Sequence, residues 1–120
     1  MRAGLQAYFD LVVARPSHEQ AMFELFHYSL RTEELADLPR AQYEKYRAMT
    51  GEVLEVGARL TGVRWLLPVD DVARLVVVLT DGITLAWLAD RDSDAASRTM
   101  DLAADAITAL ATPENRKETA

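Results

Sequence analysis

The sequence has 120 residues, a length that corresponds to one domain, and half of these residues are apolar, which excludes general disorder. It contains no cysteine, which excludes disulfides, thiolate metal sites and cysteine nucleophiles and fits a reducing compartment. The 13 basic and 19 acidic residues give a net charge of −6, which argues against a surface that coats DNA or an anionic membrane. No run of about 18 uninterrupted apolar residues is present, and no small-residue cleavage site follows the apolar start of the chain. We therefore expect a cytoplasmic protein without a membrane span.

Glycine and proline divide the chain into five segments with helical periodicity, and no segment alternates with period two over a useful length. Ser17 is predicted as a helix N-cap, with Gln20 completing a capping box, and Gly62 is predicted as a C-terminal cap. The sequence therefore predicts an all-α helical bundle of about five helices. These helices are expected over residues 5–15, 17–31, 40–62, 70–90 and 92 or 93 to 111, with one extra helical turn near 33–36.

The last three helices differ in how their apolar side chains are distributed. The fourth is apolar nearly all round, so it needs buried contacts on more than one side. The fifth is rich in alanine, which permits close packing against another helix. We therefore expect these two helices to pair with those of a second copy as an intermolecular four-helix bundle; the alternative is a monomer in which the fourth helix is simply central. The third helix has one apolar stripe, led by Tyr43, whose members are Tyr46, Met49, Val53, Val56 and Leu60.

Two stretches carry a family resemblance, LQAYFDLVVARPSHEQAMFELFHYSL near the start and ARLVVVLTDGITLAWLADRDSDAASRTMDLAADAITAL near the end. The run from residue 8 to residue 111 resembles the C-terminal effector-binding and dimerisation domain of tetracycline-repressor (TetR) family transcriptional regulators. The second stretch is similar to the final helix pair of that family. We therefore expect residues 1–111 to form one such domain and residues 112–120 to form a flexible tail.

The resemblance implies a homodimeric repressor that senses a small molecule. The effector is expected to be apolar or amphipathic and to control DNA binding through an N-terminal helix-turn-helix domain. Nothing in this sequence corresponds to that domain, so DNA is expected as a partner only through it. The chain is either an excised fragment of a longer protein, which we expect, or a family-like domain that lost its DNA-binding part. The fourth and fifth helices are expected to supply the dimer interface through Val77, Asp81, Thr84, Leu88, Thr99, Leu102, Ala103, Ala106 and Leu110.

The effector cavity is expected between the second, third and fourth helices. His27 lies among aromatic residues, where it is either a polar anchor for the ligand or a hydrogen-bonded core histidine. Asp81 is the one charge deep in the fourth helix, and we expect a partner such as Thr80, Thr84 or an arginine. The residues expected to line the cavity are Phe23, Phe26, His27, Leu30, Tyr43, Tyr46, Met49, Leu79, Ile83 and Trp87.

Metal and catalytic motifs are weak in this sequence. Glu24 and His27 spell the ExxH of carboxylate-bridged metal bundles, but a second copy is missing because Arg15 stands three residues before His18. No phosphate-binding glycine loop and no nucleophile–base set is present. We expect no enzyme, no metal and no cofactor. Two other functions remain open: a structural helical interaction module without a ligand pocket, and a carboxylate-bridged metal protein.

Overall fold

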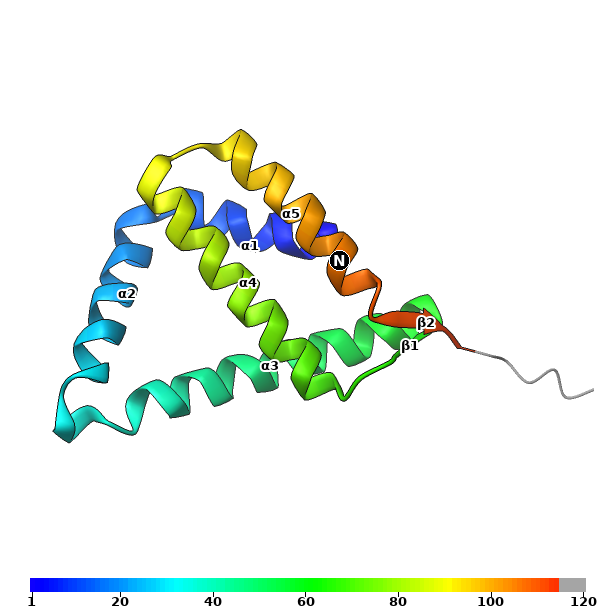
Figure 1. Cartoon of the computed structure of the whole chain (residues 1–120), viewed down its shortest axis with the longest axis horizontal. Coiled ribbons are helices and arrows are strands. Elements are labelled where there is room, and N and C mark those ends of the chain that lie inside the picture. The colour runs from blue at the N-terminus through cyan, green and yellow to red at the C-terminus, as the bar shows by residue number, and fades with distance from the viewer. Residues whose placement is uncertain (115–120) are drawn as a thin grey trace, which may run out of the picture.

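The computed structural model of the protein describes residues 1–114 and contains five α-helices and one short pair of strands (Figure 1). The predicted all-α class and the number of helices are confirmed, and every helix boundary lies within three residues of its predicted position. In chain order the elements are α1 (Arg2–Ala14), α2 (Pro16–Leu30), the 3-10 turn η1 (Glu33–Leu35), α3 (Leu38–Thr61), β1 (Val63–Trp65), α4 (Val69–Asp90), α5 (Ser93–Thr108) and β2 (Ala111–Pro113).

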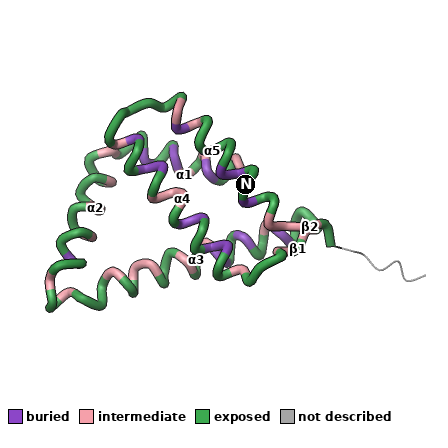
Figure 2. Tube along the Cα trace, viewed as in Figure 1, coloured by how far each residue is buried: buried purple, intermediate pink, exposed green. Residues whose placement is uncertain are grey.

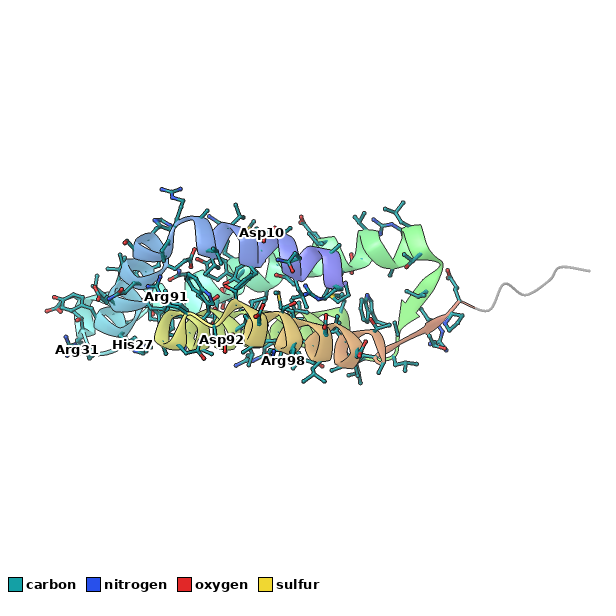
Figure 3. All side chains as sticks on the ribbon, turned by 90° about the horizontal axis from the view of Figure 1, so that it is seen from above. Asp10, His27, Arg31, Arg91, Asp92 and Arg98 are labelled. Atoms are coloured by element: carbon teal, nitrogen blue, oxygen red, sulfur yellow. The ribbon has the colours of Figure 1, made fainter. Side chains whose placement is uncertain are left out.

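The molecule is flat, with principal dimensions of 60 × 36 × 18 Å. A helix with its side chains is about 10 Å across, so the shortest dimension corresponds to two layers of helices. The ribbons of α2, α3 and α4 outline a triangle in Figure 1, and α1 and α5 cross beside the upper part of α4. Figure 3, turned by 90°, shows α1 and α5 on opposite sides of the slab. The central helix α4 therefore has neighbours in both layers.

The ends of α2, α3 and α5 are set by the residues that stand there, although the cap predicted for α2 is not formed. Pro16 occupies the first turn of α2, where its missing N–H costs no hydrogen bond, so α2 begins one residue before Ser17 and lacks a side-chain cap. The capping box predicted from Ser17 was therefore wrong. Gly62 ends α3 with a φ of 68°, as its predicted role as a cap requires. At the start of α5, the carboxylate of Asp92 accepts a hydrogen bond from the backbone N–H of Ala95 at 2.9 Å.

Two clusters of buried side chains hold the helices together, and Leu79 of α4 packs against both. Figure 2 shows that the buried positions follow α1, α4 and α5, while α2 is almost entirely exposed or half-buried. Within α2 only Ser29 is buried. The first cluster joins α1, α4 and α5 through Leu5, Phe9, Val12, Ile83, Trp87, Ala96, Met100, Ala103 and Ala104. The second joins α3, α4 and α5 through Leu54, Val72, Ala73, Val76 and Ile107.

The strand pair β1–β2 was not predicted, because no segment of the sequence alternates with period two over a useful length. The two strands are antiparallel, with Val63 opposite Pro113 and Trp65 opposite Ala111. The indole N–H of Trp65 also donates a hydrogen bond to the backbone carbonyl of Leu54 on α3 at 3.3 Å. Ordered structure therefore continues past residue 111, into the segment expected as a flexible tail. Residues 115–120 of that tail lie outside the described part of the chain.

The apolar stripe that the sequence shows on α3 faces solvent. Leu60 is 82% exposed, and the rest of the stripe is exposed with it. The face of α3 that packs against the bundle is instead built on Gly51, Leu54 and Ala58. A Cβ atom placed on Gly51 would lie 4.0 Å from the Cβ of Ala73 on α4. Small residues of α3 and α4 therefore meet here at ordinary van der Waals distance.

The packing contacts of α4 explain why this helix is so apolar. It is the one helix within residues 1–114 that is long and apolar enough to cross a membrane by those two criteria. It packs against α1, α3 and α5, and Val72, Ala73 and Ile83 are among its buried residues. The two core clusters lie on the same face of α4, one near each end, and Leu75, Val78 and Leu85 on the opposite face are exposed, so the expectation that this helix is buried on more than one side is not met within the single chain. These contacts are those of a core helix.

Candidate functional site

Tyr43 connects the three helices that outline the triangle. Its ring lies 5.4 Å, between centroids, from the ring of Phe26 on α2, and its hydroxyl donates a hydrogen bond to the Asp81 carboxylate on α4. The ring of Tyr46 lies one helical turn further along α3, 6.5 Å from that of Tyr43. The partner of Asp81 is therefore a tyrosine of another helix and not the Thr80, Thr84 or arginine that the sequence analysis expected. A series of contacts from Phe26 through Tyr43 to Asp81 therefore connects α2 to α4, and we call it the chain of contacts.

The environment of this pair shifts both of its titrating groups. The pKa of Tyr43 is raised to about 12, most of all by burial and then by the hydrogen bond to the Asp81 carboxylate and the negative charge of that group. Burial also raises the pKa of Asp81 from its ordinary value, while the hydrogen bond from Tyr43 works in the opposite direction. A carboxylate held by a phenol and not by a cation is a polar group that a ligand can compete for.

The structure divides the expected cavity residues between this chain of contacts and the core. Phe26, Tyr43 and Tyr46 come together, and Phe23 is half-buried on α2. His27 is exposed, with its ring 6.2 Å from that of Phe26, so the core-histidine alternative does not hold. Figure 3 shows His27 and Arg31 at the same end of the slab.

The remaining expected residues do not face the chain of contacts. Ile83 and Trp87 belong to the core cluster with α1, where the ring of Trp87 meets that of Phe9 edge to face at 5.9 Å. Leu79 lies between the two clusters. Leu30 and Met49 are exposed. A ligand that contacted all of these residues would therefore have to displace core packing.

A second polar contact joins α1 to the centre of α4. The hydroxyls of Tyr8 and Thr84 lie 2.7 Å apart, and the Thr84 hydroxyl also donates to the backbone carbonyl of Thr80 at 2.8 Å. The Tyr8 hydroxyl is therefore the donor to Thr84. Burial raises the pKa of Tyr8. The sequence analysis did not single out Tyr8, because its helix position marked it only as part of an apolar stripe.

The surface of α4 and α5 carries the second candidate site. Three of the residues expected at a dimer interface, Val77, Thr84 and Ala103, are buried inside the single chain. Asp81, Leu88 and Leu110 are half-buried. Thr99, Leu102 and Ala106 are exposed and follow one another along one face of α5.

The face of α4 that points outward is a different one from the expected face. We call it, together with the exposed face of α5, the outer face. On α4 it consists of Leu75, Val78, Gly82, Leu85 and Ala89, which lie three or four residues apart. Val78 is 54% exposed and Leu102 on α5 is 71% exposed, which is unusual for large apolar side chains in adjacent helices. Because α4 is apolar nearly all round, its sequence indicates that apolar residues are available for such a face, but it does not indicate which of them form it.

Comparison with family models assigns the chain. The model described as the C-terminal domain of BetI-type transcriptional repressors matches residues 1–112. The chain belongs to this family of TetR-type domains. The resemblance found in the sequence is thereby confirmed, as is the assignment to transcriptional repressors. Comparisons with curated proteins and with solved structures find no match.

Membership gives the coarse function. A TetR-type C-terminal domain is the effector-binding part of a transcriptional regulator, and domains of this kind are in general not enzymes. They typically dimerise and bind small molecules, while an N-terminal domain binds DNA. Within residues 1–114, no group of three His, Asp or Glu side chains is arranged to hold a metal ion.

Proposed function

We propose that the chain is the ligand-sensing and dimerising domain of a TetR-like repressor, acting in the cytoplasm as a homodimer. The observation that supports the dimer is the outer face, because apolar side chains are exposed on both of the neighbouring helices α4 and α5. The contacts of α4 and α5 place these two stripes on adjacent helices. Two such helix pairs packed by two-fold symmetry form a four-helix bundle and remove both stripes from water.

The effector is an apolar or amphipathic small molecule. Its proposed wall is the chain of contacts from Phe26 through Tyr43 to Asp81, with Tyr46 beside it. This wall offers aromatic surface together with one carboxylate and one phenol, the combination of apolar area and few polar groups that orients a small ligand. A ligand that displaces Tyr43 would break the hydrogen bond between α3 and α4, which links binding to the relative position of these helices.

A single measurement tests the assembly. Native mass spectrometry of the purified chain should show a species of twice 13.4 kDa. Additional mass on that dimer identifies a captured ligand and a route to its chemical class. A monomer at micromolar concentration contradicts the proposed homodimer.

A second measurement tests the effector wall. We expect Phe26→Ala to reduce the affinity for such a ligand strongly, with a loss of stability below the roughly 3–5 kcal/mol typical of a fully buried phenylalanine, because Phe26 is only half-buried. A large loss of stability without any change in ligand affinity contradicts the wall. Leu25→Ala, an exposed apolar neighbour on α2, is the matched control.

A structural interaction module without a ligand pocket is the second candidate function. The observation in its favour is the exposed stripe of α3, because Met49, Val53 and Leu60 offer apolar surface that no other described residue covers. This candidate predicts that no small molecule raises the melting temperature of the chain. A ligand-dependent rise in melting temperature that Phe26→Ala removes favours the sensing domain instead.

A further inference from the structure

A groove between the first half of α3 and the first turns of α4 gathers positive charge in a chain whose net charge is −6. Its volume is about 460 Å³. Arg40, Glu44 and Arg47 lie on one face of α3 because they are four and three residues apart, and Arg74 approaches from α4. We call this hollow the arginine groove, after Arg40, Arg47 and Arg74. The complete lining is Pro39, Arg40, Tyr43, Glu44, Arg47 and Arg74.

The guanidinium groups of the arginine groove are weakly engaged. Across the part of the chain that the structure describes, the ion pair at this groove joins Arg47 Nε to Asp70 Oδ1 at 3.9 Å, which is beyond hydrogen-bond distance. The side chain of Asp70 is 77% exposed, so water screens its charge. Arg40 and Arg74 form no ion pair with a described residue. The N–H donors that border the groove are therefore available to a ligand.

The charges of the lining do not balance. Three guanidinium groups face the groove, and Glu44 supplies the single carboxylate of the lining. Like charges around one hollow repel one another, and an anion with more than one negative charge relieves that repulsion more than a monovalent one does. The planar fork of arginine also matches the oxygen atoms of phosphate and carboxylate groups, with two parallel hydrogen bonds to each group.

We propose that the arginine groove binds an oxyanion with at least two negative charges, of the kind carried by a phosphate ester or a dicarboxylate. This site goes beyond the proposed sensing function, and it adjoins the proposed effector wall because Tyr43 belongs to both. Arg40 and Arg74 hold the anion from opposite helices, and Arg47 closes the groove between them. The site therefore requires α3 and α4 to keep their present spacing.

The test is a titration of the purified chain with inorganic pyrophosphate at constant ionic strength. Heteronuclear NMR of the arginine Nε–Hε groups should show saturable shifts that are largest for Arg40, Arg47 and Arg74. Calorimetry should give one site per chain. We expect Arg40→Gln and Arg74→Gln each to weaken binding about tenfold, the effect of losing one charge-assisted contact. Both residues are exposed, so the variants should unfold at the temperature of the parent chain.

The matched control is Arg59→Gln, which removes the same charge from the last turn of the same helix, outside the groove. It should retain affinity within about twofold, since it changes only long-range attraction. A parallel titration with succinate separates the two sources of charge: tighter pyrophosphate binding assigns phosphate, and tighter succinate binding assigns a dicarboxylate. An equal loss of affinity in all three variants, or shifts spread evenly over the arginines, overturns the site. So does binding that fails to saturate.

Discussion

The hydroxyl of Tyr43 on α3 donates a hydrogen bond to the carboxylate of Asp81 on α4. This contact spans helices that are separated by the whole of β1 and the turn before α4. The carboxylate is half-buried and the phenol is its hydrogen-bond partner among the described residues, so each group shifts the pKa of the other in addition to the larger effect of burial. The pair joins α3 to α4, and the ionisation of Tyr43 therefore reports whether the two helices keep this contact.

The titration of Tyr43 is the first consequence of this pair. With a pKa of about 12 in the folded chain against an ordinary value of 10.0, Tyr43 keeps its proton in the folded state after the unfolded state has lost it. The stability of the chain should therefore fall as the pH rises from 10 towards 12. Ultraviolet absorption of tyrosinate should show late ionisation of Tyr43 and of Tyr8, whose pKa burial also raises, and Tyr43→Phe should remove one of these two components.

Asp81→Asn distinguishes charge from burial as the origin of this shift. The amide of asparagine still accepts the hydrogen bond but carries no charge, so the pKa of Tyr43 should move down towards its ordinary value without reaching it, because burial remains the largest cause. Four tyrosines that all ionise together near their ordinary pKa would contradict the geometry of the pair.

Two glycines of α3 should respond to alanine in opposite directions. Gly57 lies inside the helix and a Cβ placed on it would meet nothing within 4 Å, so Gly57→Ala should stabilise the chain by about 0.5–1 kcal/mol. Gly62 has a φ of 68°, so Gly62→Ala should destabilise it by about 1–2 kcal/mol. Urea denaturation measures both. A loss of stability at Gly57 would show that α3 is more closely packed there than the structure has it.

The buried hydroxyl of Thr84 should matter more than its size indicates. Its side chain is fully buried, and Thr84→Val removes the acceptor of the Tyr8 hydroxyl, which should cost about 1–3 kcal/mol. In a Tyr8→Phe background the same substitution should cost clearly less, because no donor is left without a partner. Additive costs in the double variant would show that the two hydroxyls do not interact.

Charge on the outer face should separate the proposed dimer. Leu102→Glu places a carboxylate at the centre of the exposed stripe of α5 and should weaken association by about two orders of magnitude or more. Leu60→Glu makes the same change at a more exposed leucine of α3, outside the outer face, and should leave the dimer intact. Light scattering over a concentration series measures both. If Leu60→Glu dissociates the dimer and Leu102→Glu does not, the interface lies on α3.

The sequence predicted the helices well because their signals are local. The stripe of α1, with Leu5, Phe9 and Val12, is buried as its periodicity predicts. The end of α3 at Gly62 was correct because the backbone conformation there is set by one residue. These features need no knowledge of what the rest of the chain does.

The faces of α3 and α4 could not be predicted in the same way. Periodicity identified the stripe of α3 that contains Val53, but the face that packs against the bundle is a different one, built on Gly51, Leu54 and Ala58. In α4, apolar residues on all sides left the inward face open, and Val77 faces the core while Val78 faces outward. The hydrogen bond from Tyr43 to Asp81 joins residues 38 positions apart, a distance over which no local pattern carries information.

The strand pair β1–β2 has a mechanical consequence. It fastens the segment after α5 to the segment after α3, and the core clusters fasten α1, α3 and α5 to α4. The helices α1, α3, α4 and α5 are therefore held together by their packed cores and, at one end, by the hydrogen bonds of the strand pair. Helix α2 is the exception, because Ser29 is the one residue that it buries. Because α2 contributes no residue to either core cluster, it is the helix that the core of the chain holds least firmly.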